Sequence, residues 1–295
     1  MMRGKVLIAG GTGLIGSLLE MRLRNAGYEV FILTRNPKAK NHILWDPERN
    51  EIDVKRIESI EVLINLCGAG IADGRWTKKR KRILESSRIG TTNFLFKHSD
   101  KMRALKHYIS ASGITCYGYE EMDRPYSEED EFGTDYLSQL VMKWEESARQ
   151  FESICKVSIM RISIVLSGDG GALPKLMKIV KKGLASPIGS GNQWMPWIYI
   201  DDLVSVFLSV IDLELEGPLN AVTSCTRNTD FIKLLAKATG NRIWLPKVPV
   251  LTMRVVFGEM ADMLTKGVQV SNDKMYRANI RPVYNTLEGV FEICK

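Results

Sequence analysis

The segment IAGGTGLIGS, residues 8–17, constrains the fold of this chain more than any other stretch. It follows the short apolar run KVLIA and precedes LIGSLLEMRLRNAG, whose apolar spacing predicts a helix that ends at Gly27. Gly10, Gly13 and Gly16 therefore lie in a strand-to-helix turn. In such a turn the first glycine permits a tight bend, the second lets the backbone approach a pyrophosphate, and the third allows helix and strand to pack closely.

A pyrophosphate would lie at the start of that helix, where free backbone N–H groups and the helix dipole favour an anion. A glycine-rich turn without a ligand is the alternative, but its place after the first strand favours dinucleotide binding. We expect the cofactor to be held by the turn and the residues that follow it: Gly10, Thr12, Gly13, Leu14, Ile15 and Gly16.

The end of the second predicted strand indicates which dinucleotide is bound. NAD sites usually carry Asp or Glu there, which accepts from the ribose 2′-OH. Here the sequence is FILTRNP, with Thr34 and Arg35 and no acidic residue. A guanidinium can pair with a 2′-phosphate through two hydrogen bonds, and a hydroxyl can add another. This favours NADP, the alternative being that Arg35 is merely a solvent-exposed arginine.

The order of predicted elements indicates an α/β fold with a doubly wound parallel sheet of the Rossmann type. Buried strands are predicted at 5–9, 29–33, 62–66, 107–111 and 156–166, and helices at 78–97 and 136–151. We expect residues 1–165 to form the NADP-binding core, with 195–225 returning to it. Residues 166–194 and 226–295 should form a smaller C-terminal substrate lobe.

Composition excludes several other classes of protein. The chain is 45% hydrophobic and 25% charged, and no apolar run approaches the ~20 residues that cross a bilayer. The first apolar stretch runs directly into the glycine turn, which is unlike a signal peptide. Five separated cysteines without a CxxC motif, and three histidines without a ligand cluster, favour a reduced cytoplasmic protein without a metal site. No membrane partner is expected.

The net charge of +7 could suggest nucleic-acid binding. Most of the excess appears in the run KKRKR at 78–82, without which the total falls to +2. Consecutive residues spread around a helix rather than forming one stripe. We therefore expect a solvated helix start and no nucleic-acid partner.

Longer motifs carry a family resemblance. NLCGAG follows one predicted strand, SASGITCYG follows the next, and WIYIDDL comes late in the chain. With the glycine turn, these resemble the extended short-chain dehydrogenase/reductase family, and more narrowly its atypical epimerase-family branch, similar to sugar-nucleotide epimerases. Marks of that branch are IADGRWT (71–77), SSR (86–88), IGSGNQWMPWIYIDDL (188–203), GPLNA (217–221) and GEMADMLTKGVQV (258–270). The resemblance covers nearly the whole chain.

The resemblance implies NADP(H) bound by the glycine turn, Thr34 and Arg35. It also implies that Leu66 and Cys67 line the adenosine side, and that Arg88 and Val165 add contacts. The branch normally carries an acidic residue five positions before the arginine, where this chain has Ile83. The alternatives are a surface arginine at Arg88 and plain strand core at Leu66 and Cys67.

The resemblance also gives candidate catalytic residues. Active members of the wider family use Ser and Tyr as donors, with a Lys that lowers the Tyr pKa; Ser112 and Tyr136 match the first two. However, one extra residue separates Ser112 from Tyr117-Gly118, and Leu140 stands in the lysine's place. Tyr136 is therefore either a catalytic acid or a packing residue of an amphipathic helix.

Other polar and aromatic residues have structural interpretations. Lys143 shares a face with Tyr136 but lies ~10 Å farther along the helix, so we interpret it, like Glu145, as an exposed charge. Arg161, within a predicted buried strand, should pair with another element. Trp194 and Trp197 are placed in a glycine-rich loop, packing lobe against core or stacking on a ligand.

Two functions remain open from the sequence. The first is an NADP-dependent oxidoreductase or epimerase that acts on a small polar substrate, such as a sugar nucleotide. The second is an NADP(H)-binding sensor or interaction protein with little turnover, which Leu140 favours.

Overall fold

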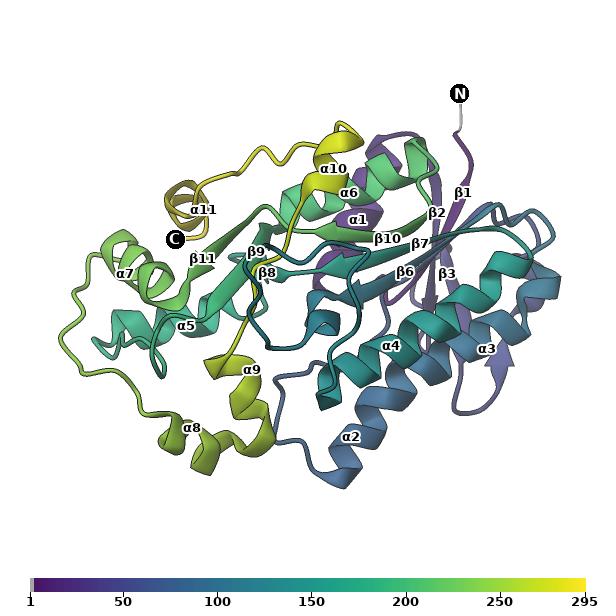
Figure 1. The fold of residues 1–295 in the computed structure, drawn as a ribbon. Helices are drawn as coiled ribbons and strands as arrows, with labels where there is room; N and C mark the ends of the chain where they lie inside the picture. Colours follow the sequence, from purple (N-terminus) through teal and green to yellow (C-terminus); the bar gives the residue numbers. More distant parts are fainter. Residues whose placement is uncertain (1–2) are drawn as a thin grey trace.

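A parallel sheet lies at the centre of the molecule, as a computed structural model shows for residues 3–295 (Figure 1). Its strands run in the order β10-β7-β6-β5-β1-β2-β3-β4, and every pair is parallel except β3 with β4. The strand order reverses at β1, which pairs with both β2 and β5: strands are added on one side through β2 to β4 and then on the other side from β5 onward. The bounds are β1 Lys5–Ala9, β2 Glu29–Thr34, β3 His42–Asp46, β4 Glu51–Ile52, β5 Val62–Asn65, β6 His107–Gly113, β7 Lys156–Ile162 and β10 Gly217–Ala221.

Helices cover both faces of this sheet. On one face α1 (Leu14–Asn25) and α6 (Ile200–Asp212) share a core with the strands, and on the other face α3 (Thr91–Lys97) and α4 (Tyr136–Arg149) do so. The strands are apolar on both sides because both faces are buried. The doubly wound α/β fold is confirmed.

The C-terminal lobe surrounds a second sheet of three strands, in the order β11-β9-β8. These strands are β8 Ile164–Leu166, β9 Trp194–Tyr199 and β11 Ser224–Arg227. A third apolar core joins them to helices α5, α7 and α11. The remaining helix bounds are α2 Lys78–Glu85, α5 Leu173–Lys181, α7 Asn228–Ala238, α8 Val250–Phe257, α9 Ala261–Thr265, α10 Asp273–Arg277 and α11 Leu287–Ile293.

The predicted strand 156–166 is in fact two strands. Its first part, β7, lies in the central sheet and its last part, β8, pairs with β9 in the lobe. The break falls at Ser163, whose N–H and hydroxyl both bond to the carbonyl of Ala221, next to β7. The segment KVSIMRISIVL hid this break, because apolar residues continue through both strands with no glycine or proline between them.

Other predictions needed correction too. The helix predicted at 78–97 is interrupted at Ser86–Gly90 by a wider, π-type turn. Strands β3 and β10 were not predicted, since β3 is short with polar residues at both ends and an exposed Leu44, and β10 begins with Gly-Pro. Trp194 and Trp197 belong to strand β9, not to a loop, and Trp197 is fully buried.

Within residues 3–295, no helix has the combined length and apolar character that crossing a membrane requires.

Candidate functional site

The glycine turn has the geometry that its spacing predicts. Gly10 adopts φ +80°, in the region that favours glycine, and a Cβ there would lie 3.0 Å from the backbone of Leu66. A Cβ on Gly16 would collide with the carbonyl oxygen of Gly10 and with Gly11. The turn is closed by the Gly13 N–H, which donates to the Gly10 carbonyl at 3.1 Å. Strand, turn and helix therefore fit together only with glycine at both ends of the turn.

The start of helix α1 is free to receive an anion. Gly13 is its N-cap residue in an extended conformation and offers no side-chain cap. Thr12 and Gly13 are exposed, whereas Leu14 and Ile15 are half-buried. Unsatisfied N–H groups at the first turn of this 12-residue helix are the expected ligands of a phosphate group.

Strand β2 ends beside this turn with Thr34 and Arg35. Thr34 is half-buried and its hydroxyl oxygen accepts from the Asn36 N–H at 3.2 Å. Arg35 is exposed and makes no ion pair with any other residue in the range 3–295. A free guanidinium at this position suits a 2′-phosphate.

Leu66 and Cys67 continue β5 along the other side of the turn. The Leu66 N–H donates to the Ala9 carbonyl at 2.9 Å, and a Cβ on Gly10 would touch both residues' backbones. Burial raises the pKa of the Cys67 thiol to about 12, and the charge of Arg35 partly opposes this. Arg35 is thus near enough to Cys67 for its charge to act on the thiol, so the ends of β2 and β5 lie close together at one edge of the sheet.

Arg88 is buried, which rules out the alternative of a surface arginine. Its guanidinium donates to the carbonyls of Ala69 at 3.1 Å and Leu84 at 3.2 Å, and lies 5.2 Å from the centre of the Trp144 ring. Burial lowers the pKa to about 10, so the group stays charged at neutral pH. No carboxylate of residues 3–295 pairs with it. A buried cation held only by carbonyls can still receive an anionic ligand.

Val165 lies where the core meets the lobe. It belongs to β8, is half-buried, and its carbonyl oxygen would be 3.8 Å from a Cβ on Gly171. The same glycine lies beside Leu14, at the start of α1. Val165 and Leu14 therefore flank one glycine from opposite sides.

The structure does not bring Ser112 and Tyr136 together. Ser112 is buried and its hydroxyl donates to a carboxylate oxygen of Glu145 at 2.6 Å. Glu145 lies nine residues beyond Tyr136 on α4, which is about 13 Å along the helix axis. Thr115 is the residue near the start of this helix, where its carbonyl accepts from the Ser138 hydroxyl at 2.8 Å. The extra residue between Ser112 and Tyr117-Gly118 was the signal of this displacement.

Tyr136 packs against the basic helix α2. Its ring centre is 5.3 Å from that of Trp76, and the Lys81 ammonium lies over the ring at 4.3 Å. Burial raises the pKa of the phenol, opposite to what an acid–base tyrosine needs. Leu140 is 5% exposed and packs with Leu84. Sequence reasoning missed Lys81, because no spacing rule connects it to α4.

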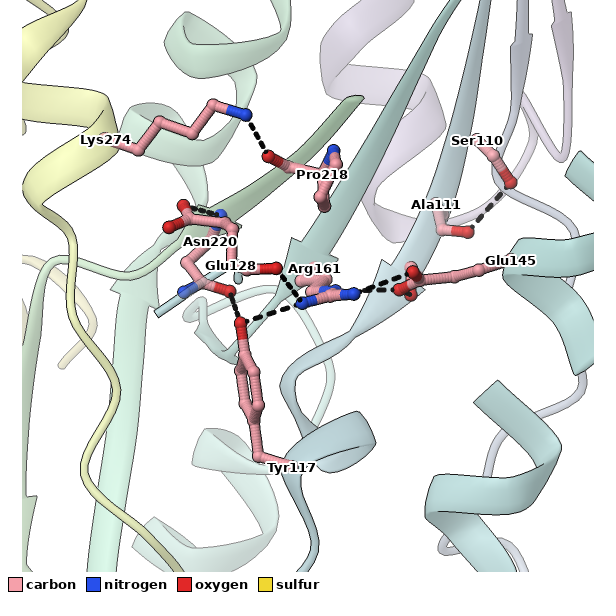
Figure 2. A network of polar contacts seen from close by, with 10 residues as sticks. Ser110, Ala111, Tyr117, Glu128, Glu145, Arg161, Pro218, Asn220 and Lys274 are labelled. Atoms are coloured by element: carbon pink, nitrogen blue, oxygen red, sulfur yellow. Dashed lines mark hydrogen bonds and ion pairs between the residues drawn. The ribbon is translucent and has the colours of Figure 1, made fainter. Parts of the chain in front are cut away.

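A buried ion pair occupies the space beside Ser112 (Figure 2). Arg161 on β7 meets Glu145 on α4 through two bonds of 2.9 Å each. The expected partner for Arg161 is therefore confirmed, whereas the prediction that Glu145 is exposed is wrong, since it is 2% exposed. Arg161 also donates to the Tyr117 hydroxyl, which donates to Asn220 at 2.6 Å. The polar groups of this network are hydrogen-bonded to one another, and together they connect β6, β7, β10 and α4. Lys143 is exposed, as expected.

Asp201 and Asp202 lie in the first turn of α6, but neither side chain caps the helix. Asp202 accepts from the backbone N–H groups of Val283 and Tyr284 at 2.8 and 3.0 Å, and Asp201 pairs with Arg22 at 2.8 Å. Asp202 therefore joins α6 to the C-terminal segment, and Asp201 joins α6 to α1.

Comparison with known proteins agrees with this geometry. The NAD dependent epimerase/dehydratase family model matches residues 6–221. The epimerase family protein SDR39U1 of Mus musculus is 33% identical over 273 residues, covering 90% of this chain and 91% of that protein. The crystal structure of human epimerase family protein SDR39U1 with NADPH superposes with a TM-score of 0.87 and 28% identity, covering 98% of each chain.

A more distant solved structure shares the fold alone. The UDP-glucose 4-epimerase of Thermotoga maritima, solved with UDP-glucose, is 20% identical with a TM-score of 0.79, covering 98% of this chain and 97% of that one. The family model spans most of the chain, and the mouse relative matches almost end to end. This chain belongs to the NAD dependent epimerase/dehydratase family.

Proposed function

We propose that this chain binds NADP(H) in the crevice at the carboxyl ends of β1, β2 and β5. The observation that carries the proposal is Arg35, exposed and without an ion pair in the range 3–295, at the end of a strand that no carboxylate follows. The human relative that was solved with NADPH supports the choice of cofactor. The crevice also lies at the switch point of the sheet, where ligands bind in open α/β folds.

Each predicted residue has a role in this proposal. The N–H groups that follow Gly13 would hold the pyrophosphate, and Thr34 and Arg35 would hold the 2′-phosphate. Leu66 and Cys67 would line the adenosine side of the cofactor site. Arg88, next to Gly68, would supply positive charge, and Val165 would border the site where it faces the lobe. When bound, NADPH supplies a hydride for reduction of a substrate.

We infer that the reaction class is oxidoreduction or epimerisation of a small polar substrate, such as a sugar nucleotide. The family supports this class. Proton transfer would then proceed without the usual lysine, because Leu140 is apolar and buried. Tyr136 remains a candidate acid, and Ser112 would influence the site only through Glu145.

A second candidate function is NADP(H) binding with little turnover, as in a sensor. It is favoured by the hydroxyl of Ser112, which donates to Glu145, and by the position of Glu145 nine residues beyond Tyr136 on α4. One measurement separates the two candidates. The NADPH complex is mixed with carbonyl compounds or sugar nucleotides, and the absorbance of the reduced nicotinamide is followed. Single-turnover oxidation supports the enzyme, and its absence across these substrates supports the sensor.

Calorimetric titration tests the cofactor proposal. NADPH should bind more tightly than NADH, and Arg35→Ala should erase most of the preference, since a hydrogen bond to a charged group contributes ~1.5–3 kcal/mol. Arg49→Ala is the matched control, because the Arg49 side chain is 75% exposed and pairs only with Asp46. Equal affinities for NADPH and NADH in the parent protein would defeat the proposal.

A further inference from the structure

Besides the run at 78–82, basic residues are concentrated in two segments of the C-terminal lobe. Residues 170–200 contain four lysines and no acidic residue, and residues 231–258 contain five basic residues and no acidic residue. These nine charges exceed the net charge of +7, so the rest of the chain is slightly acidic. By contrast, the run at 78–82 is partly neutralised, because Arg80 pairs with Asp73 and Lys81 with Glu259.

The same two segments expose large apolar side chains. Trp244 is 70% exposed, Leu251 73% and Val255 67%, which is unusual for residues of their size. Helix α8 is apolar around most of its surface, and Met253 is its buried residue. The exposed apolar residues of these segments are Ile179, Leu184, Trp244, Val250, Leu251, Val255 and Val256.

The two segments that carry these residues lie side by side at two places. A Cβ on Gly183 would lie 3.6 Å from the Trp244 indole nitrogen, next to Leu184. Farther along, Ile188 pairs with Val248 in a parallel bridge, and a Cβ on Gly189 would contact Val250 at 3.0 Å. In Figure 1, α5, α7 and α8 lie together on the side of the molecule away from β1 to β3. We call the surface from Ile179 to Val256, with its flanking basic residues, the basic apolar strip.

The basic residues of the strip are largely uncompensated. Lys178 and Lys182 flank Ile179 on α5, and both are exposed. Within residues 3–295, the four lysines of α5 and its end make no ion pair, nor do Arg242 and Lys247. Lys247 donates to the Ser190 carbonyl, and Lys233 and Arg254 pair with Asp230 and Asp262, so most but not all of these charges lack a partner within residues 3–295.

We propose that the basic apolar strip docks onto an anionic phospholipid surface. Lysines attract the anionic headgroups, while the exposed indole and aliphatic side chains enter the membrane interface. Stable binding of a peripheral protein requires two such weak attractions acting together. A nucleic acid would be attracted by the lysines but has no use for exposed leucine and valine. A protein partner would more often meet a mixture of both charges. The lack of an apolar run long enough to span a bilayer does not bear on this proposal, which concerns only binding at the membrane surface.

Vesicle flotation tests this proposal with the full chain. Binding to phosphatidylcholine vesicles that contain phosphatidylglycerol should exceed binding to phosphatidylcholine alone, and it should fall as salt rises. The double variant Trp244→Ala/Leu251→Ala and the double variant Lys178→Glu/Lys182→Glu should each weaken partitioning by about tenfold or more. The variant Met21→Ala/Leu213→Ala is the control, since it removes two exposed apolar side chains, 49% and 53% exposed, elsewhere on the surface.

Three outcomes would overturn the proposal. Equal binding to neutral and anionic vesicles, or none to either at low salt, would show that the strip does not recognise anionic lipid. Binding to duplex DNA that the apolar double variant retains in full, with no preference for vesicles, would show simple counterion attraction. Self-association that Trp244→Ala/Leu251→Ala abolishes would show that the strip joins copies of this chain. NADPH affinity, measured in parallel, should be unchanged in every variant, which separates this test from that of the cofactor proposal.

Discussion

Leu140 and Lys81 together define what Tyr136 is able to do. A lysine one helical turn along α4 would place a cation beside the phenol oxygen, whereas Lys81 places its ammonium over the ring face at 4.3 Å. The cation therefore stabilises packing of the ring more than it stabilises a phenolate. Because burial raises the pKa of Tyr136, the hydroxyl is a proton donor that is slow to lose its proton at neutral pH.

We predict that Tyr136→Phe leaves any turnover with NADPH within about tenfold of the parent rate, since removing a working general acid costs ~10²–10⁴-fold. The measurement is single-turnover oxidation of bound NADPH by the best substrate found. Tyr136→Ala is the companion variant, and it should lower stability because the contact with Trp76 is lost. A loss of hundredfold in Tyr136→Phe, with the fold intact, would make Tyr136 a true acid.

His107 gives the protein a defined acid sensitivity. The ring is 3% exposed, and its Nε2 lies 2.6 Å from the Ser158 hydroxyl, which itself donates to the Leu215 carbonyl. Because the hydroxyl proton is already used, the imidazole Nε2 donates to the hydroxyl oxygen. Burial lowers the pKa of His107 to about 4, below the ordinary ~6.5 of an unfolded chain.

Protonation therefore favours the unfolded state. Stability should be intact above pH ~6.5, fall by roughly 3 kcal/mol between pH ~6.5 and ~4, and level off below that with respect to this group. His107→Gln keeps a donor but removes the titration, so its unfolding free energy should depend less on pH in this window. Parallel curves for parent and variant in urea unfolding would refute this account.

At the scale of elements, the pair Glu145–Arg161 fixes α4 against the central sheet. Arg161 lies at the carboxyl end of β7, in register with Ser112 of β6 and Asn220 of β10. The hydrogen-bond network around the Arg161 guanidinium therefore connects three strands and a helix (Figure 2). The sequence indicated that Arg161 needed a partner but not which one, because helical spacing on α4 could not tell Glu145 from the exposed Glu146.

Glu145→Ala should destabilise the fold by about 3–5 kcal/mol, because it leaves Arg161 buried without a counter-charge. The matched control is Asp130→Ala, which breaks the pair with Arg124, whose side chain is 58% exposed, and should cost about 1 kcal/mol beyond its backbone contacts. Chemical denaturation measures both. A cost for Glu145→Ala no larger than that of the control would contradict the role given to the pair.

Over the whole molecule, the sequence predicted the features that depend on residues close together in the chain. The glycine turn, the buried strands β1, β2, β5 and β6, and the two-sided sheet followed from spacing and apolarity. The division of 156–166 between two sheets did not, because only the distant partners Ala221 and Trp197 determine where the chain changes sheets. The surroundings of Ser112 could not be predicted for a similar reason, because its hydroxyl bonds to Glu145, which lies 33 residues later in the chain.

The central claim is that Arg35 and the glycine turn hold NADP(H), and a crystal structure of this chain with NADPH tests it most directly. The distance from the Arg35 guanidinium to the cofactor's 2′-phosphate is the quantity to measure. The account predicts a hydrogen-bonded pair, at about 2.7–2.9 Å, with the pyrophosphate at the first N–H groups of α1. A 2′-phosphate left in solvent with Arg35 turned away, or a cofactor bound away from the turn, would contradict it.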